Sequence, residues 1–485
     1  AFTAFGRALS IDSTFALAGM AQELAANWSL TNFGTSQGLE IAFRHRDHLG
    51  PRDLILLHIW LPRQFEGRRL TGREIVEVRE RLVEQIADRP EAWYLLGDQY
   101  FHAGPALGFS WEESSARAEN AFRHALALDP NIQYLWMHLA DLAWDRGNRG
   151  RYVHVLDSLG PKLPNVDLLR AMATGDSAAV RRLGKRLDTL PTAELLMVAS
   201  YEAYELGAVE LSDSTMARAI ARPGDLSQRR NVLRAARSMY WGQGRPTDAA
   251  RMDLRLRELE TEPPTFVNSE AILAAMFADG DSLSASRAVQ SLARNFDWHT
   301  ARDTLPVNSH LLPALYLGLW AAWRGDTITS NAAVRYFDAL GHMRDTTGDV
   351  TIPNWFADGL RVAASLRSPR RDVVERLDGI LEQGPVYNAE ARAMSNVLAA
   401  RAWEQLGDRP RAAQAATRAA TREVLWVMPL PALREQGRML LALGDTAGAV
   451  RAWRQYLLAR AAEPPQRKAD DKIRAKLAEL EHAEH

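Results

Sequence analysis

The feature that most constrains the fold is a glycine followed by a turn-prone residue, which recurs along the chain at related distances. Gly407-Asp408 is followed 37 residues later by Gly444-Asp445, and a small residue stands seven positions before each glycine, at Ala400 and Gly437. A glycine in a left-handed conformation commonly ends a helix, and self-similarity at a period of ~20–50 residues indicates stacked repeats. We therefore expect repeated pairs of helices. The same mark stands at Gly147-Asn148, Gly244-Arg245, Gly280-Asp281 and Gly325-Asp326, and Gly207 is expected to end one more first helix.

The most complete repeat begins at Pro90 and ends at Pro130. Its first half follows the spacing W-x2-L-G-x2-Y, and its second half the spacing A-x3-F-x2-A. We expect Gly97 and Ala118 to be small because the two helices of the pair touch there, and we expect residues 104–111 to form a loop extending from one face. The residues that carry the pattern are Trp93, Leu96, Gly97, Tyr100, Ala118, Phe122 and Ala125.

This pattern resembles the tetratricopeptide repeat (TPR), and the resemblance covers nearly the whole chain. It implies an all-α fold, a right-handed α-solenoid of about a dozen TPR-like helical hairpins. We expect divergent TPR-like hairpins that start mid-repeat over residues 1–87, and a TPR superhelix with a C-terminal capping helix over residues 88–485. Because distant hairpins of a solenoid share no contacts, we expect unfolding to depart from two-state behaviour.

A narrower resemblance rests on residues 4–18, 90–97 and 122–130. These segments resemble the C-terminal TPR region of bacterial Ser/Thr kinase or winged-helix signalling proteins that carry a TolB-like domain. The resemblance implies the sensor or interaction region of a larger protein, placed either extracytoplasmically after a membrane helix or in the cytoplasm. Ala1, Phe5 and Ala8 repeat the spacing of a second helix. We therefore expect the chain to be a fragment that starts mid-hairpin.

Composition and motifs limit the classes of function. The chain has 59 Lys and Arg against 60 Asp and Glu, a formal net charge of −1, which gives no overall field for nucleic acid. No apolar run approaches the ~18–20 residues of a membrane helix, so we expect no direct membrane insertion of this segment. There are no cysteines, which excludes thiolate metal sites. No kinase loop, P-loop or nucleophile elbow occurs, so we expect neither catalysis nor a cofactor.

Three clusters of polar residues have a functional and a structural interpretation. His45 and His48, with His58 ten residues on, are either metal ligands or exposed and capping histidines, and we favour the second. Glu112-Glu113 and Asp470-Asp471 are either catalytic acids or residues at a helix start or on a solvated helix face, and again we favour the second. For the arginines we favour solvated helix ends over a nucleic-acid patch. These arginines are Arg146, Arg149, Arg151, Arg367, Arg370 and Arg371.

The candidate binding site is the concave face that first helices line in repeats of this kind. Trp93, Trp403 and Trp453 fall on packing positions, whereas a second set of positions faces the groove in two adjacent hairpins. Its aromatic and Met side chains flanked by carboxylates are typical of a peptide-binding surface. The alternative is that the 104–111 loop or a neighbouring hairpin covers them. The groove-facing set comprises Tyr94, Asp98, Phe101, His102, Tyr134, Met137, Asp141, Trp144 and Asp145.

Two functions remain open from the sequence. The first is a scaffold that binds a protein or peptide in its concave groove, with the carboxylates selecting a basic segment. The second is a structural subunit of a larger assembly, docked through its convex face or its ends. We expect no metal site in either case.

Overall fold

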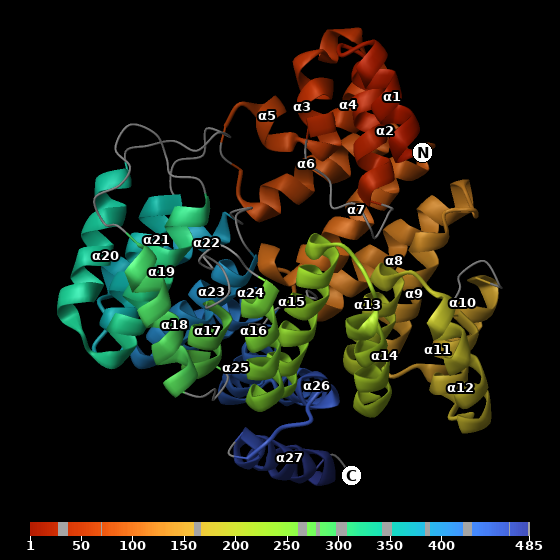
Figure 1. Ribbon diagram of the computed structural model, residues 1–485. Helices are drawn as coiled ribbons and strands as arrows, with labels where there is room; N and C mark the ends of the chain where they lie inside the picture. Colours follow the sequence, from red (N-terminus) through yellow and green to blue (C-terminus); the bar gives the residue numbers. More distant parts are fainter. Residues whose placement is uncertain are drawn as a thin grey trace. The chain divides into compact units, whose positions relative to one another are not determined.

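The computed structural model is an all-α solenoid of helical hairpins, and no strand occurs in the part of the chain that it describes (Figure 1). The described residues are 1–27, 37–68, 70–159, 166–259, 269–277, 282–296, 308–341, 352–383, 389–420, 429–464 and 466–483. The chain divides into two compact units. Unit 1 comprises Ala1–Gly104 with Phe109–Val198, and unit 2 comprises Pro105–Gly108 with Ala199–His485. The expected boundary after residue 87 separates divergent from regular repeats and stays a prediction.

Unit 1 runs from α1 to the first turns of α13. Its helices pair in chain order, for example α7 with α8 and α9 with α10. Its elements are α1 (Phe2–Ile11), α2 (Ala16–Asn27), α3 (Gln37–Arg44), the 3-10 turn η1 (Arg46–His48), α4 (Pro51–Trp60), α5 (Pro62–Glu66), α6 (Gly72–Gln85), α7 (Pro90–Ala103), α8 (Trp111–Leu128), α9 (Gln133–Asp145), α10 (Arg149–Leu159), α11 (Val166–Thr174), α12 (Ser177–Gly184), η4 (Lys185–Thr189) and α13 (Thr192–Ser200).

Unit 2 continues the same pairing, for example α15 with α16, α23 with α24 and α25 with α26. Its elements are η2 (Pro105–Leu107), the π-helical turn η5 (Tyr201–Glu205), α14 (Val209–Ala221), α15 (Leu226–Gln243), α16 (Pro246–Leu259), α17 (Ser269–Phe277), α18 (Ser282–Asn295), α19 (Asn308–Arg324), α20 (Thr327–Leu340), α21 (Ile352–Ala364), α22 (Arg371–Glu382), α23 (Ala389–Gln405), α24 (Arg409–Ala419), α25 (Pro429–Leu443), α26 (Thr446–Leu458) and α27 (Gln466–Ala483).

The recurring glycine acts as predicted, because it ends the first helix of a pair in a left-handed conformation. Gly147, Gly244, Gly325, Gly407 and Gly444 all have φ between 69° and 93°, and Gly207 has φ 65°. In three of these pairs the following aspartate caps the second helix: the Asp326, Asp408 and Asp445 side chains accept hydrogen bonds from backbone N–H groups of the first turn. One dipeptide thus closes one helix and opens the next. Gly280 lies outside the described residues.

The small residues mark close helix contacts, also as predicted. A Cβ added at Gly97 would lie 2.6 Å from two ring carbons of Phe122, and one at Gly437 would lie 2.4 Å from the Trp453 ring. Ala118 is fully buried between α7 and α8. The segment 104–111, however, is no open loop. Its residues Pro105, Ala106, Leu107 and Phe109 are buried, and the Phe109 ring packs edge-on against Tyr100 with centroids 5.3 Å apart.

Gly97→Ala is expected to destabilise the protein by ~1–3 kcal/mol, because the new methyl group would overlap the wholly buried Phe122 ring. Gly150, on the exposed first turn of α10, is the matched control, since a Cβ there meets nothing closer than 3.9 Å. Gly150→Ala should stabilise by ~0.4–1 kcal/mol by removing backbone freedom from the unfolded chain. Urea unfolding of the two variants measures both changes. A shift of the same sign in both would refute the assigned helix contact.

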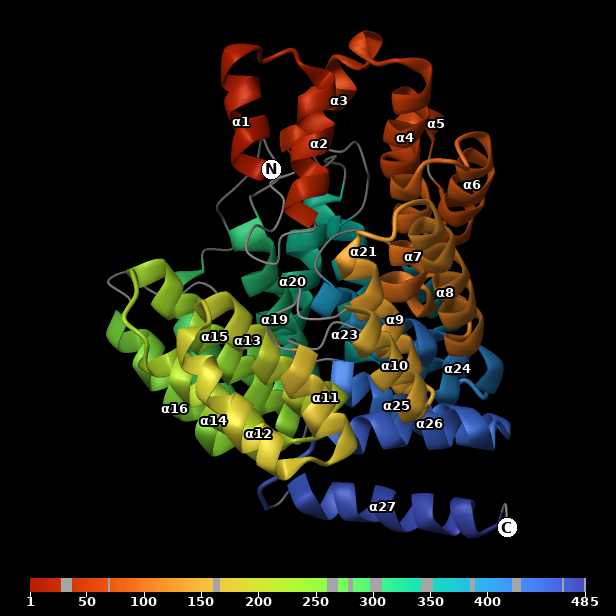
Figure 2. The ribbon, with the colours of Figure 1, turned by 90° about the vertical axis from the view of Figure 1, so that its right-hand side faces the viewer.

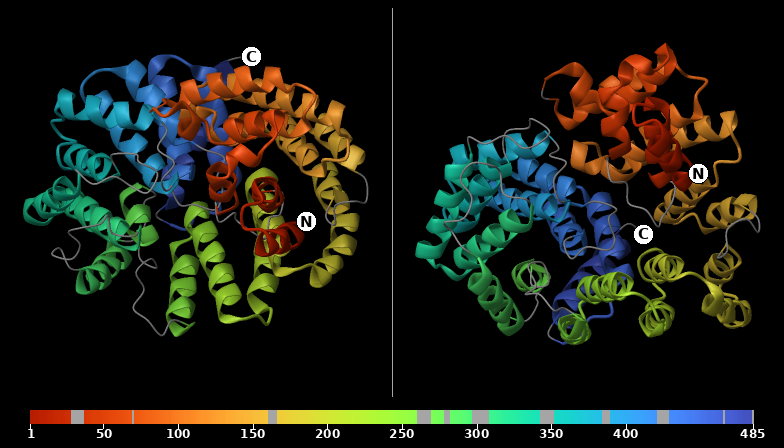
Figure 3. Two further views of the ribbon diagram at one scale, coloured as in Figure 1. Left: turned by 90° about the horizontal axis from the view of Figure 1, so that it is seen from above. Right: turned by 45° about the horizontal axis from the view of Figure 1, so that its top comes forward.

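Unit 2 closes on itself, which corrects the expectation that distant hairpins share no contacts. The chain after α26 returns to the end of α15: the Ala461 N–H donates to the Gln243 carbonyl over 3.1 Å, and the Glu463 N–H donates to the Gly244 carbonyl over 2.9 Å. The Thr247 hydroxyl lies 2.6 Å from a carboxylate oxygen of Glu463. Within this unit the blue C-terminal helices return beside the yellow-green α15 (Figure 3).

A buried ion pair secures this closure. Arg460 donates from Nε to Asp470 Oδ2 over 2.9 Å and from Nη1 to the Gly242 carbonyl over 2.9 Å. The Tyr456 hydroxyl donates to Asp470 Oδ1 over 2.6 Å. Asp470 is 0% exposed, so its expected place on a solvated helix face is wrong, whereas its neighbour Asp471 is exposed. The pair joins α27, which runs beside α26 (Figure 2), to α15.

Among the described helices, none is both long and apolar enough to cross a membrane.

Candidate functional site

The candidate site lies on α7 and α9, the first helices of two adjacent hairpins in unit 1. Positions 94, 98 and 102 of α7 fall on one helix face, and positions 137, 141 and 144–145 of α9 fall on another, because residues three and four apart are neighbours on a helix. His138 joins the two helices, since its Nε2 lies 3.6 Å from Asp98 Oδ1. His138, which is not in the predicted set, thus links α7 to α9.

Three members of the set are covered rather than free in the groove. Tyr94 is 3% exposed, Phe101 5% and Asp141 6%. The Phe101 ring packs against His138 of the next hairpin, with centroids 4.2 Å apart, and against Phe122, with centroids 6.0 Å apart. A neighbouring hairpin therefore covers Phe101, as the alternative interpretation allowed. Of the two alternatives left open by the sequence, the covered one describes Tyr94, Phe101 and Asp141 in this structure.

Five members stay half-exposed: Asp98, His102, Met137, Trp144 and Asp145. Trp144 packs edge-on against Tyr152 of α10 with centroids 5.0 Å apart, and the Arg149 guanidinium lies 5.4 Å from the Trp144 ring. These contacts hold the indole in place while leaving part of it open. The side chain of Tyr134 lies outside the described residues.

His138 is the residue that sequence reasoning missed. It is buried, and its Nδ1 lies 3.8 Å from Asp141 Oδ2. Burial alone would lower the pKa of His138, but Asp141 and Asp98 outweigh burial and raise it. His138 directly follows Met137, which is predicted to face the groove, so helical spacing alone does not place His138 on that face. The signal that could have found it is its spacing to Asp141, which is three residues and therefore one helical turn.

Asp98 lies at the centre of these charges. His102 Nε2, one turn further along α7, lies 3.5 Å from Asp98 Oδ1. Burial would raise the pKa of Asp98, yet the charges of His102, His138 and Arg79 together lower it. Arg79 makes its own hydrogen bonds to the Ile59 and Trp60 carbonyls and to Gln99. The Asp98 carboxylate is thus kept as an anion beside two imidazoles.

The other clusters have structural roles. The rings of His45 and His48 have centroids 5.8 Å apart. His58 stacks instead on Phe65 and lies 3.3 Å from Glu66, so among the described residues these three histidines do not gather their nitrogens as ligands of one metal ion would. Glu113 lies in the first turn of α8, and its carboxylate pairs with Arg117 over 3.0 Å. Of the arginines, two pair with the same carboxylate of α8: Arg146 and Arg151 both contact Glu119. Among the expected core tryptophans, Trp403 and Trp453 are buried, while Trp93 is half-exposed and stacks on His124 with centroids 4.4 Å apart.

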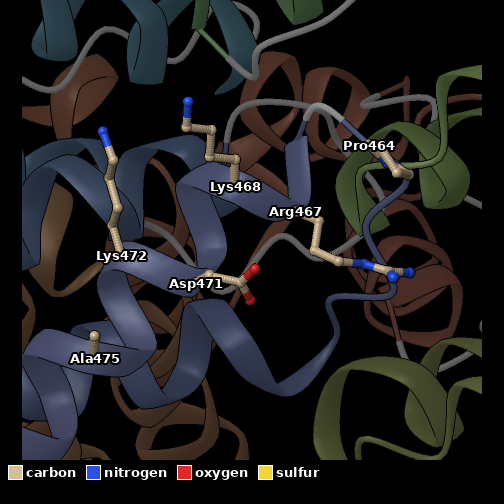
Figure 4. A pocket seen from close by; sticks show the side chains of 6 residues that line it. All are labelled: Pro464, Arg467, Lys468, Asp471, Lys472 and Ala475. Atoms are coloured by element: carbon tan, nitrogen blue, oxygen red, sulfur yellow. The ribbon is translucent and has the colours of Figure 1, made fainter.

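A shallow depression lies over the first half of α27 in unit 2 (Figure 4). Three cationic side chains and one carboxylate line it, and the two lysines extend away from the helix. The depression presents charged side chains but is too open to enclose a ligand. Its lining residues are Pro464, Arg467, Lys468, Asp471, Lys472 and Ala475.

Two of the solved structures that are similar to this chain illustrate the comparison with known proteins. A structure of Naa15/Naa10 bound to HypK-THB is 13% identical over 94% of this chain and 69% of that chain, with a TM-score of 0.24. The TPR domain of P58(IPK) is 13% identical over 76% of this chain and 95% of that chain, with a TM-score of 0.20. Neither superposition is close enough to carry an argument about ligands. No protein-family model matches the chain, and no curated protein matches its sequence.

Proposed function

We propose that this chain is a non-enzymatic scaffold that binds a protein or peptide on the half-exposed face of α7 and α9. The observation that supports the proposal is the contact between Asp98 of α7 and His138 of α9, two helices that each carry half-exposed members of the predicted set. The exposed part of this face combines Met137 and Trp144 with the carboxylates of Asp98 and Asp145. Aromatic and Met side chains dominate binding hot spots, and carboxylates set charge preference.

The surface is smaller than the sequence alone suggested. Among the members of the set whose side chains the structure describes, Tyr94 and Phe101 are covered, Trp144 is a half-exposed aromatic anchor, and Met137 supplies adaptable apolar area on the same helix. The carboxylates favour a segment that carries a basic or amine group. Because the two helices are held by the packing of their hairpins, the cost of ordering the site on binding is small.

The function is tested with peptides selected from a random display library against the full chain. Trp144→Ala with Met137→Ala is expected to weaken a selected peptide by at least ~30-fold, since a truncated hot spot costs ~2 kcal/mol or more. Trp323→Ala is the matched control, because Trp323 is also a partly exposed tryptophan, 46% exposed, but belongs to α19 of unit 2. Calorimetric titration compares the variants. An equal loss in the Trp323 variant, or no loss in the double variant, would remove the site from α7 and α9.

The wider setting is part of the same proposal. The resemblance of residues 4–18, 90–97 and 122–130 to bacterial signalling proteins supports a role as the sensor or interaction region of a larger protein of that kind. The sequence of the gene upstream of Ala1 tests it directly, because an upstream kinase or winged-helix domain would support this setting and an unrelated protein would refute it.

A second function is favoured by one observation at helix α1 of unit 1. Helix α1 has no buried residue, Ile11 is 88% exposed, and Phe15 and Leu17 are exposed beside it. Exposed apolar side chains gathered in this way mark interaction surfaces. The chain would then be a structural subunit docked through this end.

A further inference from the structure

Three side chains of the α7–α9 junction offer ligand atoms to one point. Asp98 and His102 stand one turn apart on the same face of α7, and His138 reaches them from α9. Asp98 Oδ1 lies 3.5 Å from His102 Nε2 and 3.6 Å from His138 Nε2, and the ligand atoms of all three lie within 4.8 Å of one another. Within the described residues, Asp98, His102 and His138 are the three His or carboxylate side chains whose ligand atoms come this close together.

These separations are close to the separations between neighbouring ligand atoms of a small metal ion. An N–H···O hydrogen bond has its heavy atoms ~2.7–3.2 Å apart, so both contacts of Asp98 are too long to be good ones. Around a tetrahedral zinc ion with ligands at ~2.0–2.1 Å, neighbouring ligand atoms stand ~3.3 Å apart. The two contacts from Asp98 are therefore close to the edges of such a tetrahedron.

The chemistry of the donors agrees with this geometry. Two imidazoles and one carboxylate form a ligand set that zinc takes in proteins, with a fourth position left to water or a ligand. Imidazole ligands select transition metals over Mg²⁺ and Ca²⁺, which prefer sets made of oxygen alone. We propose that Asp98, His102 and His138 bind a divalent transition-metal ion, with Zn²⁺ as the best fit, and that the ion ties α7 to α9.

The surroundings of His138 hold its ring in the orientation that such a site needs. Asp141 Oδ2 lies 3.8 Å from Nδ1, on the side of the ring opposite Nε2. At this distance the Asp141 carboxylate acts on the ring through its charge, which strengthens the imidazole as a donor, and histidine ligands commonly have such a carboxylate beside their second nitrogen. The rings of Phe101 and Phe122 pack on His138 with centroids 4.2 Å and 5.1 Å away. His138 therefore enters the cluster from an apolar wall, while the half-exposed His102 leaves a path to solvent.

Arg79 does not take the place of the ion. Its charge acts on Asp98, but its hydrogen bonds go to the Ile59 carbonyl, the Trp60 carbonyl and Gln99. Among the hydrogen bonds of the described residues, none joins Arg79 to Asp98. The metal site shares Asp98 with the proposed peptide surface, but metal binding and peptide binding have separate readouts, so each proposal can fail without the other.

The test uses the full, untagged chain, stripped with a chelator and titrated with zinc chloride. We expect one Zn²⁺ per chain and a higher melting temperature, because an ion that binds only the folded state stabilises it. His102→Ala and Asp98→Asn should each weaken binding by at least ~100-fold, and Asp141→Asn by ~10–100-fold, the usual effect of an outer partner. His124→Ala is the matched control, because His124 lies on the exposed side of α8 and stacks on Trp93.

Cobalt substitution identifies the ligands by a second route. Co²⁺ bound by two imidazoles and a carboxylate should give visible absorption bands in the wild-type chain that His102→Ala removes, and circular dichroism should show that this variant keeps its helices. Retained zinc affinity in the His102 and Asp98 variants would overturn the proposal. So would an equal loss in His124→Ala, or a wild-type chain that binds no zinc.

Discussion

Asp470→Ala is expected to destabilise unit 2 by about 3–5 kcal/mol, the usual cost of removing one partner from a buried ion pair. The substitution would leave the Arg460 guanidinium buried with the Gly242 carbonyl as its remaining acceptor and would take the acceptor from the Tyr456 hydroxyl. Because this pair ties α27 to the end of α15, we expect the loss to spread to both helices. Urea unfolding, together with hydrogen exchange in α15 and α27, measures the effect.

Two further variants make the test specific. Asp471→Ala should change the free energy of unfolding by less than ~0.5 kcal/mol, because its contact with Arg474 lies on the exposed side of α27. Asp470→Ala combined with Arg460→Met should recover part of the lost stability, since no charge is then left buried. A small loss in Asp470→Ala with no recovery in the double variant would mean that the closure of unit 2 does not depend on this pair.

The second large effect concerns Glu202, which is 1% exposed on the π-helical turn η5 of unit 2. Burial raises the pKa of Glu202 to about 7, although Thr215 and Arg218 act in the opposite direction. Below about pH 4.5 the Glu202 carboxyl is protonated in both the folded and the unfolded chain, so its ionisation then costs the folded state nothing. As the pH rises to about 7, the unfolded chain ionises first, and the folded state loses ~1.4 kcal/mol per pH unit, about 3 kcal/mol in all.

Glu202→Gln should remove this dependence. At pH 8 we expect the variant to exceed the wild type in stability by about 3 kcal/mol, and at pH 4 we expect little difference. Glu210→Gln, on the exposed side of α14, is the control and should change little at either pH. Thermal melting of the three proteins from pH 4 to pH 8 gives the comparison. A constant difference between wild type and Glu202→Gln across this range would show that Glu202 does not titrate there.

The junctions of the solenoid could be predicted because they depend on local chemistry. A glycine such as Gly407 or Gly444 is needed where the backbone turns with positive φ, and the aspartate after it caps the next helix. The contact of Gly97 with Phe122 could be predicted for a similar reason, since only a small residue fits there. Both features lie within one repeat, so spacing alone reveals them.

The features that the sequence did not reveal depend on residues from other repeats. Asp470 resembles any solvated carboxylate until the chain after α26 returns to α15 and buries it with Arg460. Phe101 falls on a groove position by helical spacing, yet His138 of the next hairpin covers it. Asp98, His102 and His138 also form a group that spacing does not reveal, because His138 lies in the next hairpin, far along the sequence from the other two.

The most direct test of the central claim is hydrogen exchange of the full chain with and without a peptide selected from the display library. If α7 and α9 form the binding surface, bound peptide should slow exchange in Pro90–Ala103 and Gln133–Asp145 while α1 and the helices of unit 2 keep their rates. Protection confined to α1 would favour the structural subunit instead. Protection in unit 2 alone, or a selection that yields no binding peptide, would contradict the account.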